Sequence, residues 1–361
     1  MKRNDRGDIL DFRSFFEVQP SVWQYFKTCG KPVVLYGMGD GADKVLAAFE
    51  RYGIRVSGVF ASDGFVRGQR FRDFTVKRLA DIEEEFGDFA VALCFASQLP
   101  EVMAQMKRVA QRHETRVPSV PVFGNTLFDE AFVKEHINSI EKARALLADA
   151  QSKRVFEGVL AFLHTGELRY LDNITTGKDE AFSLLDLGEN EVYIDLGAYN
   201  GDTIDEFLHY SGGRYRRIIA LEPNGKNFEK LRAHCAEMEN VELWQLGAWS
   251  ESTTLTFNNK AGRNSAIASK GVPTRVAAVD SLLGGVRAGY VKVDVEGAER
   301  ETLLGMKRTL RSKPKLNFAA YHRTEDIFSL PLLIAELNPE YRIFLRHHPY
   351  IPAWDTNIYA I

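Results

Sequence analysis

The chain has 361 residues, of which 45% are hydrophobic and 26% are charged, proportions typical of a soluble globular protein with about two domains. Its 46 basic and 49 acidic residues give a net charge of −3, which argues against a binding surface for nucleic acid or for an anionic membrane. The three cysteines lie far apart and no apolar run approaches the ~18 residues of a membrane-spanning helix, so we expect a cytoplasmic protein without a disulfide framework. The composition leaves the oligomeric state open.

The first third of the chain alternates β-rich runs with an amphipathic run. Apolar, β-branched residues gather at 33–36, 54–60 and 89–95, and a helical pattern occupies 41–52. Such alternation is typical of βαβ units and a parallel sheet. We therefore predict a small Rossmann-like α/β domain over residues 1–128.

A glycine turn follows the first of these strands. The three positions of a G-x-G-x-x-G/A phosphate-binding turn are occupied by Gly37, Gly39 and Ala42. Asp63 lies roughly 20 residues further on, where a dinucleotide-binding domain has its ribose-binding acid. Asp40 and Asp43 at the same helix start would repel a phosphate, so a turn that binds nothing is the alternative. Residues 31–123 resemble the nucleotide-sugar-binding domain at the head of bacterial sugar acyltransferases, through this turn and the segment Gly-Val-Phe-Ala-Ser-Asp that ends at Asp63.

The middle and the end of the chain predict a helical linker and a second α/β domain. Apolar residues recur at helical spacing over 132–147 and 155–163, so we expect two linking helices within residues 129–172. A second and longer alternating series fills residues 173–361. Its β-rich runs are 192–194, 218–221, 241–246, 290–293, 316–320, 343–346 and 358–361.

The second series opens with another glycine turn, over residues 192–203. Here Tyr199 stands where a pyrophosphate-binding turn needs its second glycine, which favours a nucleoside with a charged amino-acid tail over a dinucleotide. Asp195 ends the strand beside the turn and can hold an ammonium group or order the loop. A helix-capping role for Asp195 is the alternative.

The next two strands end in residues suited to a nucleoside. Glu222, followed by Pro223 and Asn224, places a carboxylate at the carboxyl edge of the sheet, where it can accept hydrogen bonds from both ribose hydroxyls. Gly247 and Ala248 follow the third strand and are small enough to let a flat base lie against the backbone.

These segments, together with Lys-Val-Asp-Val-Glu-Gly-Ala-Glu over residues 292–299, resemble the FkbM family of S-adenosylmethionine-dependent methyltransferases. The resemblance covers about 173–361, including Asn264-Ser265, Tyr321-His322 and a closing segment that departs slightly from the family's Glu-Thr-Val-Leu-Tyr form. It implies a Rossmann-like class I methyltransferase domain with a mostly parallel, seven-stranded sheet and a hairpin inserted over 255–275. It also implies S-adenosyl-L-methionine as cofactor and a hydroxyl acceptor. The cofactor-binding residues that we predict are Asp195, Gly197, Ala198, Asn200, Gly201, Asp202, Thr203, Glu222, Pro223, Asn224, Gly247 and Ala248.

Methyl transfer to a hydroxyl also needs a group that removes the acceptor's proton. Asp294, Glu296 and Glu299 crowd the exit of one predicted strand, where they can hold a divalent ion or cap the following helix, and we predict no metal. His322 follows another strand and is our first candidate for the base, with a structural hydrogen-bonding role as the alternative. The predicted catalytic residues are therefore His322, Asp294 and Glu296.

A basic run near the end of the chain is the last feature. The run consists of Arg342, Arg346, His347 and His348. His347 and His348 are adjacent on a predicted strand and point to opposite faces, so they cannot share a metal. We expect this run to be a solvated strand end, with binding of an anionic substrate as the alternative.

The sequence therefore predicts an S-adenosylmethionine-dependent O-methyltransferase that acts on a small molecule, a sugar or a related metabolite, with nucleotide-linked sugars included. In this hypothesis the front domain binds or docks the acceptor. The alternatives are a nicotinamide-dependent oxidoreductase or a nucleotide-sugar-binding protein that uses the front glycine turn, and a non-catalytic binding protein that has kept the fold.

Overall fold

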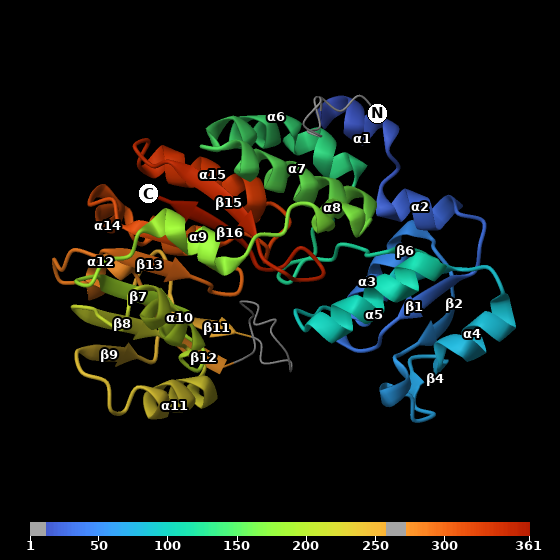
Figure 1. Cartoon of the computed structure of the whole chain (residues 1–361), viewed down its shortest axis with the longest axis horizontal. Coiled ribbons are helices and arrows are strands. Elements are labelled where there is room, and N and C mark those ends of the chain that lie inside the picture. Colours follow the sequence, from blue (N-terminus) through green and yellow to red (C-terminus); the bar gives the residue numbers. More distant parts are fainter. Residues whose placement is uncertain (1–11, 258–271) are drawn as a thin grey trace.

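The computed structural model describes residues 12–257 and 272–361, which form two α/β lobes joined by a layer of helices (Figure 1). In the front lobe the described strands form a six-stranded sheet in the order β3-β4-β2-β1-β5-β6. All pairings in this sheet are parallel except that of β3 with β4. The strands are β1 (Val33–Tyr36), β2 (Val56–Phe60), β3 (Arg70–Phe71), β4 (Phe74–Lys77), β5 (Ala90–Leu93) and β6 (Glu114–Arg116).

The helices of the front lobe follow the strands as a parallel sheet requires. They are α2 (Val22–Thr28), α3 (Asp40–Tyr52), α4 (Leu79–Phe86) and α5 (Pro100–Arg112). The strands predicted at 33–36, 54–60 and 89–95 and the helix predicted at 41–52 all form, with no end shifted by more than two residues. A short 3₁₀ turn, η1 (Asp63–Phe65), follows β2.

A layer of helices connects the lobes at the top of Figure 1. It consists of α1 (Phe12–Val18), α6 (Glu130–Leu146), α7 (Ala150–Thr165) and α8 (Arg169–Asp172), whereas α9 (Lys178–Leu185) packs on the second lobe. Asp129 and Asp149 start the two long helices, since each side chain accepts a hydrogen bond from a backbone N–H of the first turn, at 2.8 and 2.6 Å. Buried residues of α6 and α7 belong to a hydrophobic cluster that also includes residues of both sheets, so this layer is part of the core.

The second lobe holds a seven-stranded sheet of described residues in the order β15-β16-β14-β13-β7-β8-β9. β16 runs antiparallel to both of its neighbours and the remaining pairings are parallel. The strands are β7 (Val192–Leu196), β8 (Arg217–Leu221), β9 (Val241–Trp244), β13 (Tyr290–Val293), β14 (Lys315–Ala319), β15 (Ile343–His347) and β16 (Thr356–Ala360).

The order of these strands defines where a ligand binds. The chain passes from β7 to β8 and β9 on one side and returns to β13 on the other side, so strand order reverses beside β7. The carboxyl ends of strands at such a switch point form a crevice. The helices of this lobe are α10 (Asp202–Tyr210), α11 (Gly225–His234), α12 (Val279–Leu282), α13 (Glu299–Leu304), α14 (Lys307–Arg311) and α15 (Asp326–Leu337).

The chain between β9 and β13 forms a small separate sheet. β11 (Thr253–Phe257) and β12 (Val272–Ala277) pair antiparallel, and β12 also pairs with β10 (Gly247–Ala248). This arrangement corresponds to the hairpin expected over 255–275. Asn264 and Ser265, which contributed to the family resemblance, lie outside the described residues.

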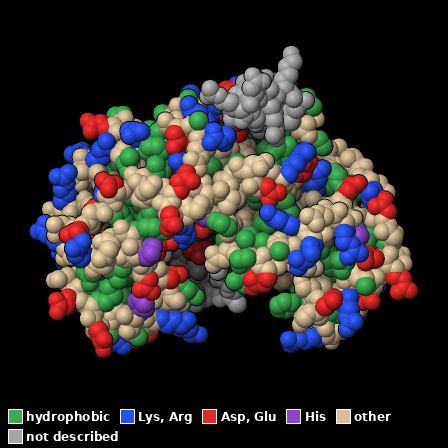
Figure 2. All heavy atoms as spheres, in the orientation of Figure 1, with side chains coloured by type: hydrophobic (Ala, Val, Ile, Leu, Met, Phe, Trp, Pro, Cys, Tyr) green, Lys and Arg blue, Asp and Glu red, His purple; other side chains and the backbone are tan. Residues whose placement is uncertain are grey.

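The surface shows no segregation of charge in the view of Figure 2, where basic and acidic side chains are interspersed over both lobes and a notch opens between the lobes at the lower edge. This pattern agrees with the net charge of −3. None of the helices in the described part of the chain combines the length and the apolar character needed to cross a membrane.

The predicted solvated strand end is wrong. Arg346, His347 and His348 are all buried, with exposed fractions of 2%, 0% and 1%. The guanidinium of Arg346 binds the Asp149 carboxylate at 2.7 Å and the Ser152 hydroxyl at 2.8 Å, because α7 packs over β15. The basic run therefore fixes the helical layer to the second sheet.

We expect the Arg346→Ala variant to lose about 3 kcal/mol of stability, the lower end of the cost of breaking a buried ion pair, because Asp149 is one-third exposed. The matched control is Arg342→Ala, at an exposed residue immediately before β15, which we expect to change stability by less than about 0.5 kcal/mol. Urea unfolding of both variants measures the difference. Equal midpoints for the two variants would show that the Arg346 pair does not anchor the layer.

Candidate active site

The turn after β7 passes very close to the end of β13. Gly197 has φ +87°, and a Cβ at this position would lie 1.9 Å from the carbonyl oxygen of Asp294. Its N–H donates to the carbonyl of Leu221 at the end of β8, at 3.0 Å. The missing side chain at Gly197 therefore lets three strand ends meet at the switch point.

Asp195 lies fully buried beneath this turn, with an exposed fraction of 0%. Thr203 Oγ1 at the start of α10 donates to Asp195 Oδ2 at 2.5 Å, and Lys292 Nζ lies 3.9 Å from Oδ1. Among the described residues no donor forms a hydrogen bond to Oδ1. Burial raises the pKa of Asp195, and the charge of Lys292 opposes that shift. Asp195 therefore holds the loop through the Thr203 hydroxyl and does not cap the helix backbone.

Glu222 connects the first two loops. Its carboxylate accepts hydrogen bonds from the backbone N–H groups of Tyr199 at 3.0 Å and Asn224 at 2.8 Å, and only 6% of the residue is exposed. Burial raises the pKa of Glu222, and the two N–H donors oppose that shift. Tyr199, at φ +47°, leaves its side chain 49% exposed beside this carboxylate.

The third loop closes against the second. A Cβ on Gly247 would lie 3.0 Å from the Val276 side chain and 3.8 Å from Pro223, and Ala248 is buried. Thus the loops after β7, β8 and β9, which hold all the predicted cofactor-binding residues, lie side by side at one edge of the sheet.

The second group of predicted residues forms a buried cluster of acids around a histidine. His322 Nδ1 lies 2.7 Å from Glu299 Oε1, and its Nε2 lies 3.4 Å from Asp294 Oδ1 and 3.7 Å from Glu296 Oε2. His322 and Glu299 are buried, whereas Glu296 is exposed. The structure therefore joins the two predicted catalytic groups into one, with Glu299 rather than Glu296 as the nearest carboxylate to the imidazole.

His322 does not fit the predicted role of general base in this arrangement. Burial alone would lower the pKa of His322, but the carboxylates of Glu299, Asp294 and Glu296 outweigh burial and raise the pKa to about 10. At neutral pH the imidazole already carries both of its protons and cannot accept another. The catalytic roles of both residues stay predictions, and Asp294, which reaches the edge of the cluster, is the better candidate for the base.

The cluster also has the donor atoms of a metal site. Asp294, Glu299 and His322 each offer one ligand atom, and these three atoms lie within 4.8 Å of one another. A divalent cation would have to displace the proton of His322, since only the neutral imidazole binds metal. The prediction of a metal-free reaction stays a prediction.

The raised pKa of His322 makes stability depend on pH. The unfolded imidazole titrates near ~6.5, so its contribution to stability is complete below that pH and is lost as the pH rises to about 10. We expect the free energy of unfolding to fall across this interval, and to fall less in His322→Gln. Urea unfolding at several pH values measures the slope, with His209→Gln, at an exposed position, as the control that should keep it. Equal slopes in the wild type and in His322→Gln would contradict the raised pKa.

Sequence reasoning missed two members of this site. Lys292 on β13 places Nζ 3.7 Å from Asp294 Oδ2. Burial would lower the pKa of Lys292, but the charges of Asp294 and Asp195 outweigh burial and raise that pKa, so the amine stays charged. The Tyr321 hydroxyl donates to Asp294 Oδ2 at 3.4 Å. The period-two spacing of Lys292 and Asp294 along the strand was the signal for the first of them. Lys292 and Asp294 also line a small polar cavity of about 70 Å³.

The front loop supports this edge from the other lobe. A Cβ on Gly297, at φ +94°, would lie 2.6 Å from the ring of Phe123. Arg323 covers the other side of that ring at 4.3 Å and donates to the Gly297 carbonyl at 2.9 Å. The backbone of Phe123 also donates to the carbonyl of His322 at 2.8 Å. Residues of the front segment therefore hold the acidic loop in place.

The glycine turn of the front lobe is partly filled by a neighbouring side chain. A Cβ on Gly37 would lie 2.7 Å from the Phe95 ring, although the space beside Gly39 is free of described atoms within 4 Å. Asp43 pairs with Arg72 at 2.7 Å, and Asp63 is exposed in η1. Asp40 and Asp43 occupy the first turn of α3, which a phosphate would need.

Comparisons with known proteins agree with this geometry. Residues 195–352 match the family model described as the methyltransferase FkbM domain. The crystal structure of methyltransferase FkbM from Methylobacillus flagellatus KT is similar over 98% of this chain and 94% of its own, with a TM-score of 0.72 and 19% identity. Aeropyrum pernix fibrillarin with natively bound S-adenosyl-L-methionine matches over 51% of this chain and 74% of its own, at 14% identity and a TM-score of 0.34, too low to carry an argument. No curated protein matches the chain in sequence.

The fold is therefore the Rossmann-like α/β fold of class I methyltransferases. The chain carries a methyltransferase FkbM domain over residues 195–352, which confirms the resemblance seen in the sequence.

Proposed function

We propose that the chain transfers a methyl group from S-adenosyl-L-methionine to a hydroxyl of a small acceptor, a sugar or a related metabolite, with nucleotide-linked sugars included. The observation that carries the proposal is the contact between the Gly197 turn and Asp294, which joins the loop edge suited to the cofactor to a group suited to accept a proton. Cofactor and base then lie at one switch point, as in-line transfer requires.

The residues present suit this cofactor. The buried Oδ1 of Asp195, without a hydrogen-bonding donor among the described residues, is an acceptor for the ammonium of the methionine part. Glu222 lies at the end of β8, where its carboxylate can exchange its backbone donors for the ribose hydroxyls. Gly247 and Ala248 leave a flat surface for the base. When bound, the cofactor supplies an electrophilic methyl on a sulfonium.

The protein's own groups then handle the acceptor and its proton. The acceptor hydroxyl gives its proton to the carboxylate of Asp294 as the oxygen attacks the methyl group. Tyr321 donates a hydrogen bond to the same carboxylate and orients it. The charged amine of Lys292 and the protonated His322 on either side of Asp294 keep the carboxylate ionised before transfer.

The direct test is transfer of a labelled methyl group. The purified chain, given S-adenosylmethionine with a tritiated methyl and a panel of hydroxyl and amine acceptors, should label a hydroxyl compound and release S-adenosylhomocysteine in equal amount. Labelling of amines alone would overturn the oxygen preference. A nicotinamide-dependent change in absorbance without any labelled product would favour the oxidoreductase alternative.

A further inference from the structure

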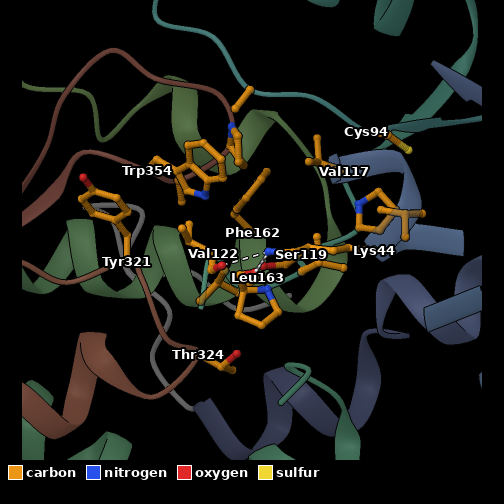
Figure 3. Close-up of a pocket in the computed structure, with 18 of the residues that line it drawn as sticks. Lys44, Cys94, Val117, Ser119, Val122, Phe162, Leu163, Tyr321, Thr324 and Trp354 are labelled. Carbon is orange, nitrogen blue, oxygen red and sulfur yellow. Dashed lines mark hydrogen bonds between the residues drawn. The ribbon is translucent and has the colours of Figure 1, made fainter. Parts of the chain in front are cut away.

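A large cavity lies where the front lobe, the helical layer and the second sheet meet. Its volume is about 390 Å³, within the range of about 300–1,000 Å³ that small-molecule sites occupy. Figure 3 shows Tyr321 and Trp354 on one side, Cys94 and Lys44 on the other, and Phe162 with Leu163 between them. The cavity thus takes its walls from both lobes and from α7.

The lining is mostly apolar, and two of its polar side chains, Lys44 and Thr324, are already engaged. Lys44 Nζ donates to the carbonyls of Pro121 at 3.1 Å and Val122 at 2.9 Å, drawn as dashed lines in Figure 3. The Thr324 hydroxyl donates to the carbonyl of Thr126. What the cavity offers to a ligand is therefore mainly apolar surface, which a ligand with an apolar body covers at the least cost in desolvation.

Tyr321 links this cavity to the site already described. Its ring forms part of the cavity wall, whereas its hydroxyl points away from the centre and reaches Asp294 Oδ2 at 3.4 Å. Tyr321 therefore connects the cavity wall to the carboxylate of Asp294, which is not itself part of that wall.

We propose that this cavity between the lobes binds the methyl acceptor, and that the acceptor carries its hydroxyl on an apolar body. The inference rests on the proposed methyltransferase function and names the acceptor class of the same site. Among the acceptors of the proposed function, the inference selects a related metabolite with an apolar body over a bare or nucleotide-linked sugar, whose many hydroxyl and phosphate groups would lose water against a mostly apolar lining. The front lobe contributes to acceptor binding through the wall formed by Cys94 and its neighbours, which includes Met38, Asp40 and Gly41 of its glycine turn.

The test uses three probes with the full chain. 2-Naphthol carries a hydroxyl on an apolar ring, methyl α-glucoside carries hydroxyls on a polar ring, and UDP-glucose is a nucleotide-linked sugar. Calorimetry measures the binding of each, and S-adenosylhomocysteine is titrated in parallel. We expect 2-naphthol to bind and to become labelled by tritiated S-adenosylmethionine, and the two sugars to do neither.

Two substitutions that fill the cavity locate the binding. Leu163→Trp on α7 and Ser119→Phe on the opposite wall should each weaken 2-naphthol binding at least tenfold while leaving S-adenosylhomocysteine affinity unchanged. Leu146→Trp makes the same change as the first at a position 40% exposed on α6, outside the cavity, and should leave both affinities unchanged.

The outcomes separate the two proposals. If S-adenosylhomocysteine binds but 2-naphthol does not, or if both filled variants bind 2-naphthol like the wild type, the cavity proposal fails and the methyltransferase proposal stands. If the wild type labels a sugar and the filled variants label it at the same rate, the cavity proposal is equally overturned. If the wild type does not bind S-adenosylhomocysteine, the methyltransferase proposal fails and the acceptor assignment falls with it.

Discussion

Asp294→Asn is expected to lower the rate of methyl transfer at least about a hundredfold while S-adenosylhomocysteine still binds. The amide keeps the shape of the side chain and its contact with the Tyr321 hydroxyl, but it cannot take the acceptor's proton. Single-turnover transfer of labelled methyl measures the rate, and calorimetry measures the affinity. Because His322 is already protonated, it does not replace Asp294 as the base.

The control for this variant is Asp63→Asn. Asp63 is exposed in the front lobe, at the position that a ribose-binding acid would occupy in a dinucleotide domain. The substitution therefore makes the same chemical change outside the proposed site. We expect it to leave methyl transfer unchanged. Full activity in Asp294→Asn would place the base elsewhere, and loss of activity in Asp63→Asn would return the chemistry to the front lobe.

Gly197→Ala is expected to weaken S-adenosylhomocysteine binding more than tenfold. The added methyl would lie 1.9 Å from the carbonyl oxygen of Asp294, a backbone atom that cannot turn aside, so the loop after β7 must shift away from β13. The displaced loop carries Tyr199, whose N–H binds Glu222, and its shift disturbs both ends of the predicted cofactor site. Calorimetric titration of the variant measures the loss.

Gly285→Ala separates this clash from backbone strain. Gly285 has φ +91°, close to the +87° of Gly197, but a Cβ there has no described atom within 4 Å. In both variants an alanine must adopt a left-handed backbone conformation, which costs about 1–2 kcal/mol, and only in Gly197→Ala does the added methyl also meet the Asp294 carbonyl. Equal cofactor affinity in the two variants would show that the close approach of the loops does not matter for binding.

Much of the fold could be predicted because its signals are local. A strand followed by a glycine turn and a helix start marks the carboxyl edge of a parallel sheet, so the segments that end at Asp195, Glu222 and Asp294 were placed correctly on strand ends. The apolar spacing over 132–147 and 155–163 likewise predicted α6 and α7.

The environment of side chains that meet across the molecule could not be predicted in this way. The burial of Arg346 depends on α7 lying over β15, a contact that joins residues 149 and 346. The protonated state of His322 depends on Glu299, which the sequence assigned to a helix end. The cavity is lined by segments from separate regions of the chain, so no single segment of the sequence predicts it.

The measurement that tests the central claim most directly is calorimetric titration of the wild type, Asp195→Ala and Glu222→Ala with S-adenosylhomocysteine, and of the wild type with NAD. The account predicts micromolar binding of S-adenosylhomocysteine to the wild type, loss of that binding in both variants, and no heat with NAD. Binding of NAD without binding of S-adenosylhomocysteine would contradict the account and assign the activity to the front glycine turn.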